Sequence, residues 1–287
     1  MAGEIVAIGE DVKDWRKGDR VCANLAADHL YGDSNFTIKR SELGCQSPGV
    51  LTEYRTFSSH SLVSIPQHLS YEEASTLPCA ALTAYNSLRG PVPLKAGDHV
   101  LVLGTGGVST FALQFAVASG ATVIATSSSD DKLKMSSKLG AKHIINYKKT
   151  PNWDEEVLRI AMQTNGVGVD HVIEALRYKV GGYGTLPKSI KSVRFAGYIH
   201  LVGYVSGQEN ADLDVVGSAI SKGIILRGIQ IGSVAQFKDL TRVLSANPEE
   251  TRPVIDKIFP FEEAKQAYAY LKSQAHVGKI VIKVSKD

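Results

Sequence analysis

Short apolar runs recur through the middle of the chain, and amphipathic segments separate them. The runs are rich in Val, Ile and Leu and lack regular polar alternation, which is typical of strands buried on both faces. Alternation of such strands with helices implies right-handed crossovers, and therefore an α/β fold with a parallel, doubly wound sheet. The predicted strands are residues 99–103, 121–126, 143–146, 169–174, 198–203 and 224–228, with helices at 110–116, 130–139 and 153–164.

The flanking regions have weaker patterns. Residues 1–66 indicate an irregular, β-rich region. Ser70 and Glu73 form a capping-box pattern, which predicts a helix start. The remaining expectations are strands at 4–9, 52–57 and 278–283, a surface loop over 25–48, and helices over 80–88, 233–246 and 261–273.

A glycine-rich turn joins the first central strand to the helix that follows it. Glycines permit a tight turn and close backbone approach, so that free N–H groups and the helix N-terminus can face a diphosphate. A serine stands at the third glycine position, and an ordinary strand–turn–helix corner is the alternative interpretation. The surrounding strands and helices favour dinucleotide binding. The predicted diphosphate-binding residues are Gly104, Thr105, Gly106, Gly107, Val108 and Ser109.

The end of the second central strand bears on which dinucleotide binds. NAD sites place an acidic residue there to accept hydrogen bonds from the ribose hydroxyls. This chain has the neutral Ser127, followed by Ser128 and then by Lys132. Hydroxyl groups and a cation suit a 2′-phosphate, so the pattern favours NADPH over NADH. Asp130 and Asp131 weaken this argument, and an N-cap role for the serine run is the alternative.

Composition narrows the class of protein. Of 287 residues, 44% are hydrophobic and 21% charged, which describes an ordinary globular protein with room for two domains. The net charge of +3, with scattered basic residues, argues against nucleic acid as a partner. Three widely spaced cysteines suit a reducing compartment. No leader pattern follows Met1, and glycines interrupt the apolar stretch 100–125, so we expect a cytoplasmic protein without a membrane span.

Five stretches occur in the same order as in one known family. They are residues 4–12, 17–21, 77–85, the glycine turn and 276–281. Together they resemble the medium-chain dehydrogenase/reductase superfamily, in its zinc-type alcohol dehydrogenase-like and quinone oxidoreductase-like branch. The resemblance implies a GroES-like catalytic domain formed by residues 1–82 and 234–287, with a Rossmann domain over 83–233. It also implies hydride transfer from a nicotinamide cofactor.

The resemblance also implies roles for individual residues. Ser128, Lys132 and Tyr147 match family positions that contact the 2′-phosphate of NADPH. The nicotinamide end would meet Thr83, Val202, Gly203, Tyr204, Gly232 and Ser233. Family members are often dimers through the Rossmann sheet edge, which predicts a homodimer through the strand near residues 226–228.

The chain departs from the family pattern in three places. The family has a further segment before the point matching Met1, so we expect an N-terminally truncated form. Zinc dehydrogenases have a cysteine ligand at the position of Cys79, but a catalytic zinc needs about three protein ligands. The structural-zinc cysteine cluster is also absent between 21 and 52. We therefore expect no zinc, and Cys79 as a small core hydrophobe. Residues 175–179 read as an insertion.

The sequence thus predicts an NADPH-dependent, zinc-independent oxidoreductase that reduces quinones or activated C=C bonds of a small-molecule substrate. No catalytic residue is assigned, because positioning the hydride donor and acceptor accounts for most of such chemistry. A zinc-type alcohol dehydrogenase is one alternative. A noncatalytic, NADPH-binding truncated paralogue is the other.

Overall fold

The computed structural model describes residues 1–164, 166–175, 185–202 and 215–285. The chain forms two compact units. The terminal unit comprises Met1–Asn86 and Gln230–Asp287, and the central unit comprises Ser87–Ile229. These limits place Thr83, Gly232 and Ser233 in the terminal unit, whereas the sequence interpretation assigned them to the central domain.

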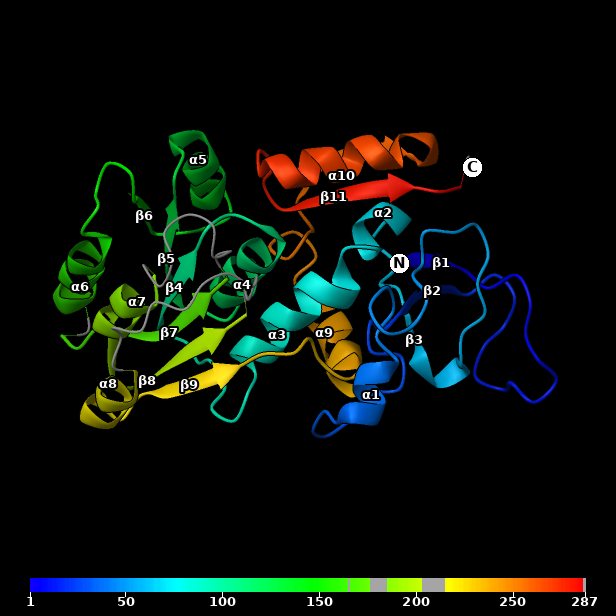
Figure 1. Cartoon of the computed structure of the whole chain (residues 1–287), viewed down its shortest axis with the longest axis horizontal. Helices are drawn as coiled ribbons and strands as arrows, with labels where there is room; N and C mark the ends of the chain where they lie inside the picture. The colour runs from blue at the N-terminus through cyan, green and yellow to red at the C-terminus, as the bar shows by residue number, and fades with distance from the viewer. Residues whose placement is uncertain (165, 176–184, 203–214, 286–287) are drawn as a thin grey trace. The chain divides into compact units, whose positions relative to one another are not determined.

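The central unit is built on a six-stranded sheet in which every neighbouring pair is parallel (Figure 1). The strand order is β6-β5-β4-β7-β8-β9, or 3-2-1-4-5-6 by order of appearance in this unit. That order defines a doubly wound dinucleotide-binding sheet, whose direction of winding switches between its first and fourth strands. The strands are β4 (His99–Leu103), β5 (Thr122–Ser127), β6 (His143–Asn146), β7 (Val169–Glu174), β8 (Val193–Leu201) and β9 (Ile225–Gly228).

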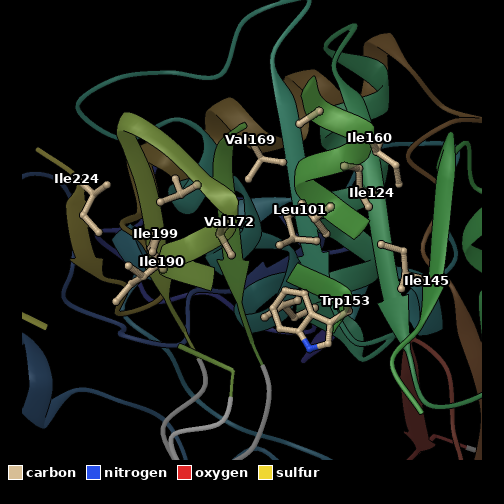
Figure 2. Close-up of a cluster of buried hydrophobic side chains, with 14 residues drawn as sticks. Leu101, Ile124, Ile145, Trp153, Ile160, Val169, Val172, Ile190, Ile199 and Ile224 are labelled. Atoms are coloured by element: carbon tan, nitrogen blue, oxygen red, sulfur yellow. The ribbon is translucent and has the colours of Figure 1, made fainter. Parts of the chain in front are cut away.

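Helices cover both faces of this sheet. Leu101 of β4 packs in a buried cluster with Trp153 and Ile160 of α6, as Figure 2 shows. Leu103 belongs to the same cluster. Val100 and Val102 alternate with them and are fully buried on the opposite face. Burial on both faces explains why residues 100–103 of β4 are all apolar. The helices of this unit are α4 (Gly107–Ala118), α5 (Asp130–Lys138), α6 (Trp153–Thr164), α7 (Leu186–Ser192) and α8 (Val215–Lys222).

The terminal unit combines two small sheets with short helices. Its antiparallel sheet has the order β1-β2-β3, and β10 pairs with β11 in parallel. Val21, Ala23 and Leu62 form the core beneath the antiparallel sheet. The strands are β1 (Ala2–Glu4), β2 (Arg20–Ala23), β3 (Leu62–Ser64), β10 (Ile255–Pro260) and β11 (Lys279–Lys283); the helices are α1 (Phe36–Arg40), α2 (Tyr71–Ala74), α3 (Leu82–Leu88, which continues into the central unit), α9 (Val234–Ala246) and α10 (Ala264–Ser273).

Most element predictions are confirmed within one or two residues, including the capping box in which Ser70 and Glu73 start α2. β8 begins five residues earlier than expected. The additional residues reach back to pair Val193 with Val169, and the irregular register is accompanied by a left-handed Ala196 at φ 53°.

Two strand predictions are wrong. Residues 5–9 and 52–57 form no strand in the described chain, and Val6 and Tyr54 are 58% and 76% exposed. The polar–apolar alternation was present at 52–57, but a strand also requires a partner in register. The expected loop 25–48 contains α1, which starts where the Asn35 side chain accepts a hydrogen bond from the Ile38 amide at 2.9 Å.

Candidate cofactor site

The glycine turn ends β4 and opens α4. Gly104 has the left-handed φ of 81°, and its amide donates to the Thr126 carbonyl at 2.9 Å, which ties the turn to β5. Gly106 is the N-cap of α4 and contributes no side-chain capping bond. A Cβ added at Gly106 would meet no described atom within 4 Å. The amides at the start of α4 therefore lie beside open space, where the positive end of the helix dipole can receive an anion.

Ser109 explains how the turn tolerates a residue other than glycine at the third position. Its hydroxyl donates to the Leu103 carbonyl at 2.9 Å, and the residue is 3% exposed. The third glycine of the fingerprint permits close packing of the helix on the strand. Here a hydrogen bond joins the two elements instead. Thr105 is buried in the turn, and Gly107 and Val108 are the first two residues of α4.

The ends of β5 and β6 bring together two residues predicted to lie near the 2′-phosphate. The Tyr147 amide donates to the Ser127 carbonyl at 3.0 Å. Ser127 is buried, while Ser128 and Lys132 are half-buried. Ser129 occupies the N-cap position of α5, but its side chain makes no capping bond. The N-cap interpretation of the serine run therefore has no side-chain hydrogen bond to support it.

Each of the two aspartates that follow the serines forms an ion pair with a lysine. Asp130 accepts from the Asn146 side-chain amide at 2.6 Å and from the Lys149 ammonium. These hydrogen bonds hold the pKa of Asp130 below its usual value. Asp131 pairs with Lys134 at 2.8 Å. Each carboxylate charge is thus balanced by a lysine.

Glu174 is a buried carboxyl that the sequence interpretation did not single out. It is the last residue of β7 and is 7% exposed. The Ser189 hydroxyl donates to Glu174 Oε2 at 2.6 Å, while Oε1 has no partner within the described structure. Burial raises the pKa of Glu174. An acidic residue at the carboxyl end of a predicted central strand was the available signal. The Val202 amide donates to the Glu174 carbonyl at 3.0 Å.

The structure describes only the first residue beyond the end of β7, Ala175, and the first beyond the end of β8, Val202. Gly203 and Tyr204, predicted to meet the nicotinamide, lie outside the described residues. The predicted insertion at 175–179 does so too, apart from Ala175.

In the terminal unit, Gly232 packs against Leu82, the residue before Thr83. A Cβ at Gly232 would stand 2.9 Å from the side chain of Leu82, the neighbour of the buried Thr83. Ser233 forms a capping box with Gln236 at the start of α9. Ile231 has a left-handed φ of 46°, which costs a β-branched residue about 1–2 kcal/mol. Gly232 and Ser233, two of the predicted residues, therefore directly follow a residue with a strained backbone.

Cys79 is not the core residue that the sequence interpretation expected. It lies in the π-helical turn Leu77–Ala81, and its side chain is exposed. Its four neighbours in the turn are buried, whereas Cys79 itself is exposed. No three His, Cys, Asp or Glu side chains of the described residues are placed to hold a metal ion.

Two family models match the chain. Residues 107–246 match the zinc-binding dehydrogenase family, and residues 1–67 match the alcohol dehydrogenase GroES-like domain. No helix in the described ranges combines the length and the apolar content needed to cross a membrane.

Relatives extend these matches along the whole chain. A zinc-type alcohol dehydrogenase-like protein of Schizosaccharomyces pombe is 46% identical over 287 residues, covering 99% of this chain and 80% of the relative. Acryloyl-coenzyme A reductase of Metallosphaera sedula is 29% identical, covering 98% and 81%. A solved structure, provisionally named alcohol dehydrogenase, from Sinorhizobium meliloti 1021 has a TM-score of 0.87 and 38% identity, covering 99% and 80%.

The doubly wound sheet, the glycine turn and these matches define the class: the chain belongs to the medium-chain dehydrogenase/reductase superfamily, in its zinc-type alcohol dehydrogenase-like group. It is accordingly an NAD(P)-dependent oxidoreductase. The predictions of superfamily, fold class and enzyme class are confirmed.

Proposed function

We propose that the protein is an NADPH-dependent, zinc-independent reductase of quinones or activated C=C bonds. The observation that carries the proposal is the start of α4. Its amides have no side-chain cap and stand beside open space at Gly106, at the carboxyl end of the first strand of the sheet. Ligands of doubly wound folds bind at this end of the sheet, and a diphosphate suits a helix N-terminus.

NADPH is favoured over NADH by the groups near the end of β5. Ser127 carries no charge that would repel a 2′-phosphate, and the backbone bond from Tyr147 to Ser127 brings the two residues together. Lys132 follows in the first turns of α5. We propose that Ser127, Ser128, Lys132 and Tyr147 surround the 2′-phosphate.

When bound, NADPH supplies a hydride from nicotinamide C4 to an electron-poor carbon or quinone, and solvent or a hydroxyl group supplies the proton. The chain's own task is to hold donor and acceptor in a reactive geometry. We propose that Thr83, Val202, Gly232 and Ser233 contact the nicotinamide end. An acryloyl thioester contains an activated C=C bond, so the Metallosphaera sedula relative's name supports this substrate class.

A zinc-type alcohol dehydrogenase is the second candidate. The description of the family that matches residues 107–246 and the name of the Schizosaccharomyces pombe relative favour it. Zinc independence is supported by the donor set, because the described residues offer no group of three ligands.

The experiment combines cofactor titration, turnover and metal analysis on one purified preparation. We expect NADPH fluorescence to report binding, a panel of quinones and enones to consume NADPH, and metal analysis to find far less than one zinc per chain. Stoichiometric zinc, with activity lost on chelation, would favour the alcohol dehydrogenase. Tight NADPH binding without consumption across the panel would identify a noncatalytic binding protein.

We also propose that the protein forms a homodimer through β9. This strand stands at the edge of the six-stranded sheet, and Ile225 on it is 46% exposed. An edge strand presents unpaired backbone groups, which a second copy of the same strand can pair with. Light scattering of the purified protein is expected to give twice the chain mass. A monomeric mass at micromolar concentration would rule this dimer out.

A further inference from the structure

Two histidines are buried side by side in the central sheet. His171 on β7 is 2% exposed, and His200 on β8 is 1% exposed. Their chain neighbours Val172 and Ile199 belong to the apolar cluster that contains the α6 side chains, so the two imidazole rings lie on the opposite face of the sheet. The rings are nearly parallel, with an interplanar angle of 10° and centroids 5.4 Å apart. Neither residue has a role in the proposed function.

One hydrogen bond joins the two rings. His171 Nδ1 and His200 Nε2 are 3.1 Å apart, and in a neutral pair one of these nitrogens carries the hydrogen while the other accepts it. Asp98 indicates which one, because its Oδ2 lies 3.7 Å from His171 Nε2. A hydrogen on His171 Nε2 is attracted by this carboxylate, whereas a bare nitrogen there would be repelled. We therefore assign the donor role to His200 Nε2 and the acceptor role to His171 Nδ1.

This arrangement has no favourable position for a further proton. His200 Nδ1 is left bare and buried, and it has no hydrogen-bond partner within the described structure. A proton on this nitrogen would create a buried cation without an acceptor, which is costly. A proton on His171 Nδ1 would instead set two N–H groups against each other and break the bond between the rings. The folded sheet therefore favours the neutral pair.

The carboxylates on the His171 side are already paired with other cations. Lys95 Nζ lies 3.0 Å from Asp98 Oδ1, before the start of β4. On β7 and β8, Arg194 Nε lies 2.6 Å from Asp170 Oδ1. Each of these cations offsets part of the attraction that its carboxylate would exert on a charged imidazole of His171. Protonation of the pair therefore gains little from the neighbouring charges.

The surroundings of His200 oppose a positive charge more directly. The cation of Arg227 on the neighbouring strand β9 disfavours protonation of His200. The Tyr198 ring stacks beside both imidazoles, and α4, which packs on β4 and β5, contains no titratable side chain. Burial lowers the pKa of His171, and it lowers the pKa of His200 to about 3.

We infer that the His171–His200 pair is an acid-sensitive switch between β7 and β8: the pair stays neutral in the folded central unit, and its proton uptake drives this unit to unfold in mildly acidic solution. In the unfolded chain the two histidines take up protons near their ordinary pKa of 6.5. Because the folded-state pKa values are lower, the stability that the neutral pair provides is complete above pH 6.5 and is lost as the pH falls below it. No cofactor takes part, so the inference is independent of the proposed function.

The expected effect is a steep rise of the unfolding equilibrium constant in acid. A histidine that stays neutral when folded and titrates normally when unfolded raises this constant about 25-fold between pH 7 and pH 5, and two such histidines raise it about 600-fold. Urea unfolding measures the constant at each pH. Trp153 lies in the core of the central unit, so its fluorescence reports on this unit in a Trp15→Phe background, which leaves no other tryptophan.

The double variant His171→Asn, His200→Gln tests the pair. The asparagine oxygen can accept near the position of His171 Nδ1, and the glutamine nitrogen can donate near that of His200 Nε2, but neither amide takes up a proton. We expect the rise between pH 7 and pH 5 to be smaller than in the wild type by at least about 25-fold. Burial also lowers the pKa values of His99 and His143, so a part of the rise should remain.

His60→Gln is the control, because the His60 side chain is 47% exposed, and this variant should keep the full pH dependence. Each variant is compared with itself at the two pH values, so a lower stability at pH 7 cancels. A double variant with the pH dependence of the wild type would overturn the inference.

Nitrogen-15 spectra of the histidine rings in the wild-type chain give a second test, which stands even if the double variant fails to fold. The signals of His171 and His200, assigned through their ring contacts with Tyr198, should remain those of neutral imidazole until the central unit unfolds. Titration of either ring near pH 6.5 while the unit is still folded would show that the sheet accommodates the charge, and the inference would be wrong.

Discussion

Gly106→Val is expected to weaken NADPH binding by at least about a hundredfold, on the order of 2.7 kcal/mol, while the chain still folds. Gly106 has the extended φ of −77° and ψ of 178°, which valine adopts without strain. The new side chain would project into space that is open in the described structure. A diphosphate must approach the α4 amides through that space, so the substitution blocks the ligand and not the fold.

The measurement is NADPH titration by fluorescence, with thermal unfolding recorded beside it. The stability loss from a poorer N-cap should be no more than about 1 kcal/mol. Gly9→Val is the control, because Gly9 is exposed and a Cβ there meets only Val12, at 3.9 Å. Undiminished NADPH binding by Gly106→Val would place the diphosphate elsewhere and remove the central support of the proposed function.

The central sheet was predictable because its physics is local. Parallel strands covered on both faces are mostly apolar, so the apolar run at residues 100–103 of β4 predicts a buried strand without reference to a partner. Residues 52–57 show the opposite case. Their alternation fits a strand, yet no neighbouring strand pairs with them in the described structure, and Tyr54 points to solvent.

In the candidate site, too, features set by neighbouring residues were predictable, and contacts between residues far apart in the chain were not. The glycine turn is contiguous in sequence, and its fingerprint was visible despite Ser109. The hydrogen bond from the Asn86 side chain to the Ile231 carbonyl was not predictable, because Ile231 lies 145 residues further along the chain and nothing local marks either residue. Cys79 was misjudged because one residue type serves equally well in a core or on a surface, and here a π-helical turn decides which.

Ser127→Asp is expected to lower the preference for NADPH over NADH by about a hundredfold, because a carboxylate beside a 2′-phosphate costs several kcal/mol. The same carboxylate can accept hydrogen bonds from the free ribose hydroxyls of NADH, as acidic residues at this position do in NAD sites. Ser127 is the last residue of β5, and its carbonyl accepts a hydrogen bond from the Tyr147 amide. The new charge would therefore stand where the proposed phosphate site is.

The test is a paired titration of NADPH and NADH against wild type, Ser127→Asp and Ser127→Asn. Ser127 is only 3% exposed, so both substitutions disturb packing. The asparagine has nearly the same size as the aspartate but no charge. Ser127→Asn should therefore keep the wild-type ratio of the two affinities, even if both affinities fall. Equal affinity of the wild-type chain for NADPH and NADH would contradict the proposal that these residues bind the 2′-phosphate. If asparagine lowers the preference for NADPH over NADH as much as aspartate does, the effect comes from side-chain shape, because only the aspartate can repel the phosphate.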